Sequence, residues 1–238
     1  MTKEQWNRFM NKPITSIIIL CWNNLEYTKL CIESIIKHTK QPYQIIAIDQ
    51  GSTDGTSDYL IKATRECNCI IIKNVENKGF ACGNNQALKL VESEYVLMLN
   101  NDCEITDDNW LEIMINASGT ADLIGAVCKQ VAPDSITKTF KYIGDGKENG
   151  RWSYIEGWCL FAKRDTWLSL NGFDEKFNPA FSEDADLSFR AKGLGMKIKA
   201  VSLPIIHHGS KSIGQIHGGH EAMSAKNNRL LYGQWIGT

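Results

Sequence analysis

The chain has 238 residues, of which 43% are hydrophobic, and its 26 basic and 27 acidic residues give a formal net charge of -1. This composition is typical of a globular protein that buries its own core, and it excludes a disordered, collagen-like or coiled-coil chain. The near-zero charge argues against a nucleic-acid binder and against a polybasic membrane-surface protein.

The eight cysteines show no zinc-finger spacing: Cys67 and Cys69 form a C-x-C pair, and no second pair follows. We therefore expect free thiols that bind no metal. The start of the chain, MTKEQWNRFMNKP, lacks the apolar core of a signal peptide. The apolar run 17–21 is much shorter than the roughly 20 residues that cross a bilayer. We expect a cytoplasmic protein without a transmembrane segment, associated with the inner face of a membrane only peripherally, if at all.

The first hundred residues alternate between strand-like and helix-like segments. Apolar, mostly β-branched runs predict buried strands at 14–22, 43–49, 69–74 and 94–100. Amphipathic stretches predict helices at about 25–38, around 59–61 and at 81–93. This alternation is typical of right-handed βαβ units, so we predict an α/β fold whose mostly parallel central sheet is flanked by helices.

The second half of the chain is less regular. Short apolar runs predict strands at 123–131, 139–143 and 154–162, which we expect to form a smaller mixed sheet. Helices are predicted at 184–192 and 226–235.

Polar clusters follow four of the predicted strands. In open parallel sheets, ligands bind outside the carboxyl ends of the strands. We therefore expect these clusters to share one edge of the sheet: Asn23–Asn24, Asp49–Asp54, Asn77–Phe80 and Asn100–Asp102.

The segment IIAIDQGSTDGT places Asp49 at the end of a buried strand. A carboxylate there can accept a hydrogen bond from a nucleobase imide N–H or from a ribose hydroxyl. Asp54 is open to a second interpretation, because an acid near the start of the next helix can simply cap it. The sequence contains no P-loop, EF-hand loop or G-x-G-x-x-G motif.

The segment LMLNNDCEI runs from an apolar strand directly into Asn100, Asn101 and Asp102, with Glu104 two residues later. Hard oxygen ligands at a strand end suit Mg²⁺ or Mn²⁺ bound together with substrate phosphates. The alternative is an ordinary polar turn, with Asp107 capping the following helix.

The segment FSEDADLSFRAKG brings Glu183, Asp184 and Asp186 to the start of a predicted helix. We expect a carboxylate at this position to stay ionised, because the helix dipole and backbone N–H groups favour the charged form, which a general base requires. Acids are also commonplace in a first helical turn without any catalytic role.

The segment IIHHGSKS places His207 and His208 after a short apolar strand, where one imidazole can complete a metal site or contact a diphosphate. The alternative is a half-exposed polar residue without a ligand. We interpret His217 and His220 as surface residues.

Taken in order, these motifs resemble the family 2 glycosyltransferases of the GT-A fold, especially bacterial rhamnosyl- and N-acetylhexosaminyl-transferases of surface glycans. The resemblance covers about residues 14–212 and is carried by SIIILCWNN, IIAIDQGSTDGT, ENKGFACGNNQAL, YVLMLNNDCEI, EGWCLFAKRDTWLSLNGFDEKF, FSEDADLSFRAKGLG and HHGSKS. It implies an inverting hexosyltransferase, with Mn²⁺ or Mg²⁺ as cofactor, in polysaccharide synthesis. The donor would be a UDP- or dTDP-linked sugar, and the acceptor a hydroxyl group of a carbohydrate or another molecule.

The same resemblance implies one GT-A domain over residues 1–238, with a nucleotide-binding half at about 14–105 and an acceptor half at about 106–238. Asp184 would be the catalytic base. Asp102 would bind the metal with His207, or less readily with His208. The implied nucleotide contacts are Cys21, Asn23, Asp49, Ser52, Asp54, Asn77, Gly79, Phe80, Asn84 and Asn101. The implied acceptor and sugar pocket contains Gly157, Trp158 and Glu183.

The chain departs from the family pattern in three places. Gln50 stands where the family often has Asn, and the metal motif Asn100-Asn101-Asp102 contains a single carboxylate. One carboxylate holds a divalent ion weakly unless substrate phosphates and water complete the shell. Residues 124–152 match no motif, and we expect them to shape the acceptor site.

Two other functions fit parts of the pattern. A sugar-1-phosphate nucleotidyltransferase would need a glycine-rich basic loop after the first strand, where this chain has CWNNLEY. A non-catalytic protein that binds carbohydrate or nucleotide sugar would not need the acids Asp102 and Asp184, which are both present.

Overall fold

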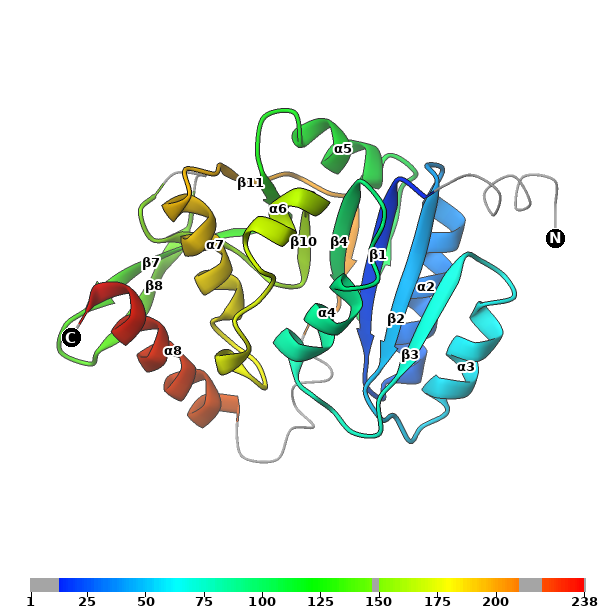
Figure 1. Ribbon diagram of the computed structural model, residues 1–238, viewed down its shortest axis with the longest axis horizontal. Helices are drawn as coiled ribbons and strands as arrows, with labels where there is room; N and C mark the ends of the chain where they lie inside the picture. Colours follow the sequence, from blue (N-terminus) through cyan, green and yellow to red (C-terminus); the bar gives the residue numbers. More distant parts are fainter. Residues whose placement is uncertain (1–12, 147–149, 210–219, 238) are drawn as a thin grey trace.

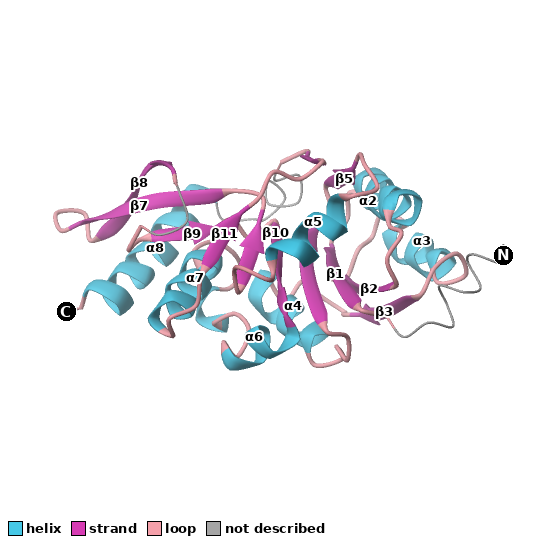
Figure 2. Cartoon of the chain, turned by 90° about the horizontal axis from the view of Figure 1, so that it is seen from above, coloured by secondary structure: helices cyan, strands magenta, loops and turns pink. Residues whose placement is uncertain are grey.

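The computed structural model describes residues 13–146, 150–209 and 220–237. Its centre is a seven-stranded sheet in the order β11–β6–β10–β4–β1–β2–β3. Helices pack on both faces of this sheet (Figures 1 and 2). The α/β architecture predicted from the sequence is confirmed.

The first half of the chain forms the parallel part of the sheet. Its elements are β1 (Thr15–Cys21), α2 (Leu25–His38), β2 (Tyr43–Asp49), α3 (Thr56–Ala63), β3 (Cys69–Lys73), α4 (Phe80–Leu88) and β4 (Tyr95–Asn100). Strand β1 pairs in parallel with both β2 and β4, and β2 pairs in parallel with β3. The helix predicted at 81–93 ends earlier, at Leu88.

The second half adds shorter elements. They are β5 (Cys103–Ile105), α5 (Trp110–Ala117), β6 (Leu123–Gly125), β7 (Cys128–Asp134), β8 (Thr139–Asp145), β9 (Ser153–Ile155), β10 (Cys159–Lys163), α6 (Arg164–Ser169), the 3-10 helix η1 (Glu175–Phe177), α7 (Glu183–Gly193), β11 (Ile198–Ala200), β12 (Ile205–His207) and α8 (His220–Ile236). Strand β10 runs antiparallel between β4 and β6.

Two runs that we predicted as single strands each form two separate strands in the structure. The run 154–162 divides into β9 and β10, and the run 123–131 divides into β6 and β7. Between β6 and β7 the chain leaves the central sheet for a separate sheet with the order β8–β7–β9, and between β9 and β10 it returns to the central sheet. This smaller sheet is antiparallel throughout, whereas we expected a mixed one.

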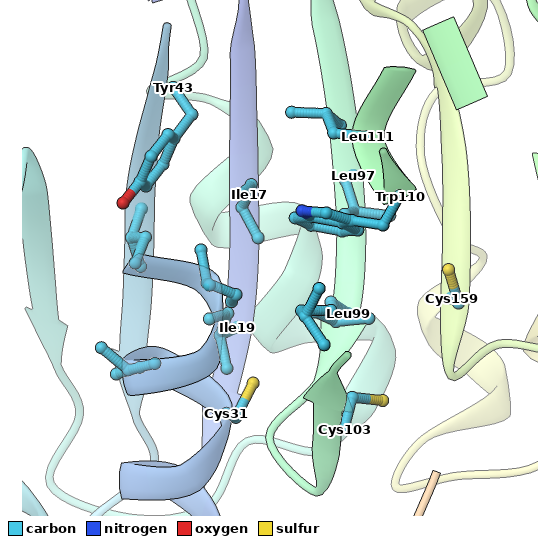
Figure 3. Close-up of a cluster of buried hydrophobic side chains, with 14 of the residues drawn as sticks. Ile17, Ile19, Cys31, Tyr43, Leu97, Leu99, Cys103, Trp110, Leu111 and Cys159 are labelled. Atoms are coloured by element: carbon cyan, nitrogen blue, oxygen red, sulfur yellow. The ribbon is translucent and has the colours of Figure 1, made fainter. Parts of the chain in front are cut away.

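The alternation of side chains along β1 builds a core on each face of the central sheet. Ile17 and Ile19 pack with residues of α2 and α5, including the fully buried Trp110 (Figure 3). Ile18 points to the opposite face and packs with residues of α4, α6 and α7. Both faces of the sheet are covered, and β1 and β4 are paired on both sides. Ligands can therefore reach these two strands at their ends.

A third cluster fastens the C-terminal helix to the rest of the molecule. Phe140 of β8, Phe189 of α7 and Tyr232 of α8 belong to it, and Figure 1 shows α8 lying alongside α7. Asp186 adds a polar anchor to this cluster and is 0% exposed.

The Asp186 carboxylate accepts hydrogen bonds from Arg190 Nε at 2.7 Å, Gln234 Nε2 at 2.7 Å and Trp235 Nε1 at 3.1 Å. The third acid of the FSEDAD motif is therefore engaged entirely inside the protein.

We predict that Asp186→Ala destabilises the protein by about 3–5 kcal/mol, because it breaks a buried ion pair and leaves three donors without their acceptor. Urea unfolding followed by circular dichroism measures the change. Glu26→Ala is the matched control, since Glu26 forms an exposed pair with Lys29 and such pairs contribute at most about 1 kcal/mol. Equal unfolding midpoints for the two variants would contradict the anchoring role of Asp186.

Candidate functional site

A cleft of about 560 Å³ is lined by residues from the carboxyl ends of β1 and β4 together with the chain before β10, the start of α7 and part of α8. Ten of the predicted site residues line it: Asn77, Gly79, Phe80, Asn101, Asp102, Gly157, Trp158, Glu183, Asp184 and His207. The expectation that polar clusters after different strands converge on one edge holds for the segments 77–80 and 100–102, and for Gln50 of the segment 49–54. Six predicted residues do not line the cleft: Cys21, Asn23, Asp49, Ser52, Asp54 and Asn84.

Contacts between two loops explain three of these six positions, those of Asn23, Ser52 and Asp54. Ser52 Oγ accepts a hydrogen bond from the Asn23 backbone N–H at 2.9 Å, and Asn23 Oδ1 accepts one from the Thr53 N–H at 2.9 Å. Asp54 accepts from the backbone N–H of Leu25 at 2.9 Å and from that of Thr56 at 3.1 Å. Asp54 thus binds the first N–H group of α2 and of α3, which agrees with an acid near a helix start, although the N-cap residue of α3 is Gly55.

Asp49 ends β2 as expected, and its side chain is 0% exposed. One carboxylate oxygen accepts a hydrogen bond from the Ser52 backbone N–H at 2.9 Å. The other oxygen, Oδ2, is buried and has no hydrogen-bond partner among the described residues. A buried acceptor without a donor is unfavourable, so a ligand donor at this position would stabilise the site.

Gln50, a departure from the family pattern, organises the loop beside the cleft. Its Nε2 donates to the Gly79 carbonyl at 3.0 Å, and its Oε1 accepts from Asn74 Nδ2 at 2.7 Å. Gly79 has a φ of +85°, and a Cβ there would lie 2.8 Å from Asn178 Oδ1. Only glycine fits this turn, which leads directly into α4.

Strands β5 and β12 bring the predicted metal ligands together. Their antiparallel pairing places His207 opposite Cys103, and His207 Nε2 lies 3.2 Å from Asp102 Oδ1. The Trp158 ring stacks on the His207 imidazole, with 4.6 Å between ring centroids. His208 instead directs its Nε2 to Glu104, 3.1 Å away. Of the two candidate histidine ligands, His207 is the one whose imidazole lies beside the Asp102 carboxylate.

The spacing of these two donor atoms fits a divalent cation. Two neighbouring ligands on an ion with bonds of about 2.1 Å lie roughly 3 Å apart, close to the observed 3.2 Å. Carboxylate and imidazole are both suitable ligands for Mn²⁺. His207 is thus a candidate for a second protein ligand beside the single carboxylate of the Asn100-Asn101-Asp102 motif. The sulfur of Cys103 belongs to the same group, in which all ligand atoms lie within 4.8 Å of one another.

Asp184 projects from the first turn of α7 into the cleft. It accepts hydrogen bonds from the backbone N–H groups of Gly157 at 2.9 Å and Ala185 at 2.8 Å. Burial nevertheless raises the pKa of this carboxyl to about 6, because desolvation outweighs the backbone hydrogen bonds that lower it. Our reasoning that the helix start keeps this acid ionised was therefore incomplete, since burial is the dominant influence.

Glu183 precedes Asp184 and is 6% exposed. Burial, reinforced by the nearby Asp184 carboxylate, raises the pKa of Glu183 well above its ordinary value. Its Oε2 atom lacks a hydrogen-bond partner among the described residues. Ser182 and Phe181, just before the helix, have φ values of 71° and 78°, in the left-handed region that side chains rarely adopt. Strained backbone of this kind is concentrated at functional sites.

Helix α8 contributes to the site in a way the sequence did not indicate. Asn228 Nδ2 donates to the Phe140 carbonyl at 2.8 Å, and Asn228 Oδ1 accepts from the Phe140 N–H at 2.7 Å. Asn227 Nδ2 donates to the carbonyl of Ala180 at 2.8 Å. These bonds hold α8 against the cleft, but they join segments far apart in sequence and leave no local motif. His217, and the side chain of His220, lie outside the described part of the chain.

The sequence is similar to one protein family and to several individual glycosyltransferases. The model of the family described as glycosyl transferase family 2 matches residues 16–176. The O-antigen biosynthesis protein RfbC of Myxococcus xanthus is 21% identical over 225 residues, covering 84% of this chain and 18% of RfbC. The glucosyltransferase WfaP of Escherichia coli is 33% identical over 103 residues, covering 43% of this chain and 39% of WfaP. The chain thus matches less than half the length of either relative.

Solved structures share the fold at low sequence identity. The mannosyltransferase PcManGT of Pyrobaculum calidifontis, solved with GDP-Man and Mn²⁺, has a TM-score of 0.65 at 15% identity, over 85% of this chain and 59% of PcManGT. TarS of S. aureus, solved with UDP-GlcNAc, has a TM-score of 0.59 at 20% identity, over 79% of this chain and 56% of TarS. Among the described residues, no helix is both long enough and apolar enough to cross a membrane.

We predict that His207→Ala weakens Mn²⁺ binding at least about tenfold, because it removes one of two protein ligands. The signal of free Mn²⁺ in electron paramagnetic resonance measures binding directly. His208→Ala is the matched control and is expected to keep the wild-type affinity, since His208 pairs with Glu104. The reverse order of effects would place the ligand at His208.

Proposed function

The chain belongs to glycosyl transferase family 2 and has the GT-A fold, and on that basis we propose that it moves a sugar from a nucleoside diphosphate donor to a hydroxyl acceptor with inversion at the anomeric carbon. The observation that carries this proposal is the meeting of Asp184 with the Asp102–His207 pair in one cleft. The first is a candidate base, and the second is a candidate site for the cation that accompanies a diphosphate.

The donor is expected to lie along the loops that follow β1, β2 and β3. The unpartnered Oδ2 of Asp49 supports a base with an imide N–H, as in UDP- or dTDP-linked sugars. Because this oxygen is buried, the surrounding loop has to open when the base enters. Gly79 and Phe80 start α4, whose N-terminal N–H groups favour a negatively charged diphosphate.

Asp102 and His207 are the residues that would hold Mn²⁺ or Mg²⁺. A divalent cation bound there offsets negative charge on the leaving diphosphate. Trp158 stacks on His207 and restricts the orientation of the imidazole, so the site is ordered before substrate arrives.

Asp184 is the proposed base that removes the proton from the acceptor hydroxyl as the new glycosidic bond forms. A pKa of about 6 suits this task, because the group is mostly ionised at neutral pH yet basic enough to take a proton. Direct displacement requires no covalent enzyme intermediate and inverts the anomeric centre.

The acceptor half of the cleft is lined by Val131, Phe140, Tyr154 and Leu231. Apolar and aromatic walls with a few polar groups are typical of small-molecule sites. The relatives RfbC and WfaP carry names that refer to O-antigen synthesis and to a diphosphoundecaprenol-linked acceptor. We therefore propose a role in the synthesis of a surface glycan.

We predict that Asp184→Asn lowers turnover by about 10²–10⁴-fold while donor affinity stays within a few-fold, because only the proton-accepting step is lost. Release of nucleoside diphosphate from a panel of UDP-, dTDP- and GDP-sugars, with water as acceptor, measures turnover, and calorimetry measures donor affinity. Asp165→Asn is the matched control, since Asp165 occupies the first turn of α6 outside the cleft. Wild-type turnover in Asp184→Asn would remove Asp184 from the base role.

The products released from two sets of substrates separate the alternatives. A nucleotidyltransferase would release pyrophosphate from a nucleoside triphosphate and a sugar phosphate. A binding protein would retain the donor without releasing any nucleotide product.

We predict that kcat/KM rises as pH increases through about 6 and is level above it, because Asp184 accepts a proton only after losing its own. A pH series at constant ionic strength and saturating Mn²⁺ measures this profile. Activity that falls as pH rises through the same region would contradict the assignment.

A further inference from the structure

We propose that Cys103 is a third ligand at the Asp102–His207 site, and that this site binds a thiophilic divalent cation, Zn²⁺ or Cd²⁺, more tightly than Mn²⁺ or Mg²⁺. The inference extends the proposed function, which assigns the same side chains to the cation of a donor diphosphate. It rests on the geometry of three side chains and needs no bound donor.

The three ligand atoms are already close together. His207 Nε2 and Asp102 Oδ1 are 3.2 Å apart, and the Cys103 sulfur lies within 4.8 Å of one ligand atom of each of these two residues. Zinc bonds of about 2.0–2.3 Å in a tetrahedral arrangement keep ligand atoms roughly 3.3–3.8 Å apart. The carboxylate and imidazole already have that spacing, so the sulfur has to approach them by only about 1–1.5 Å.

The backbone holds this group in register. Cys103 is the β5 residue opposite His207 of β12, and Asp102 directly precedes it. In the part of the chain that the structure describes, no other three His, Cys, Asp or Glu side chains come together in this way. The proximity of sulfur, oxygen and nitrogen is therefore particular to this pair of short strands.

The surroundings of the sulfur favour a soft ion. Cys103 is fully buried in the core cluster that also contains Leu99 and Cys159 (Figure 3). Its polar contact with the Trp158 carbonyl is long, at 4.0 Å, and so costs little to replace. Thiolate ligands select Zn²⁺ and related ions over Mg²⁺ and Mn²⁺, which prefer oxygen ligands.

Charge and protons balance in the proposed complex. The thiol of Cys103 releases its proton to solvent when the metal–sulfur bond forms. The thiolate and the Asp102 carboxylate then neutralise the two positive charges of the cation, while His207 binds as neutral imidazole. Three protein ligands leave a fourth position open, which is the arrangement of zinc sites that exchange a water or substrate oxygen.

Cadmium titration provides the test, because thiolate coordination produces a charge-transfer absorption band in the ultraviolet. The titrations use a Cys67→Ser, Cys69→Ser background, since that half-buried C-x-C pair could bind Cd²⁺ itself. We expect one equivalent of Cd²⁺ to produce the band. Cys103→Ser should abolish the band and weaken Cd²⁺ binding at least about tenfold more than it weakens Mn²⁺ binding. Cys159→Ser, a buried cysteine of the same core, should retain the band.

Cys103→Ala is a second variant in case serine disturbs the core, and thermal unfolding of each variant verifies folding. A band that persists without Cys103, or Cd²⁺ and Mn²⁺ affinities that fall by the same factor, would overturn the proposal. Loss of the band in His207→Ala would support it. Because these readouts require no sugar donor, they remain informative even if the assays of sugar transfer show no activity.

Discussion

The site depends on one backbone hydrogen bond across the end of the central sheet. The N–H of Asn100, the last residue of β4, donates to the carbonyl of Trp158 at 2.9 Å. Because β10 runs antiparallel to β4, the turn before β10 returns to the carboxyl end of β4. This bond places the Trp158 ring over His207 and the Gly157 N–H against Asp184. The candidate metal ligand His207 and the candidate base Asp184 thus both contact this one turn.

The charged groups that line the cleft influence the protonation of its carboxyl groups and its affinity for anions. Its described lining includes the carboxyl groups of Asp102, Glu156, Glu183 and Asp184, but no lysine or arginine. Burial raises the pKa values of Glu183 and Asp184 most strongly, and the neighbouring carboxylates raise them further. A diphosphate would be repelled here without a cation. The same arrangement thus gives the candidate base an elevated pKa and would make a cation favourable beside any diphosphate bound in the cleft.

Much of the fold was predictable because its signals are local. The helix Leu25–His38 and the strand Tyr43–Asp49 have the bounds expected from hydrophobic periodicity. The three acids at 183–186 are chemically alike in sequence, yet Asp184 faces the cleft while Asp186 is an internal anchor. That distinction depends on what packs against each face of α7. The role of Gln50 likewise arises from long-range hydrogen bonds, for which a single sequence carries no signal.

The hydrogen bonds of Asp186 connect the candidate base to the C-terminal helix. Asp184 and Asp186 occupy the same turn of α7, and the second is tied to Gln234 and Trp235 near the end of α8. Deleting or displacing that helix would free the turn that presents the Asp184 carboxyl. A version of the protein that lacks this helix is therefore expected to differ in the proton affinity of the cleft, even where the rest of its secondary structure is intact.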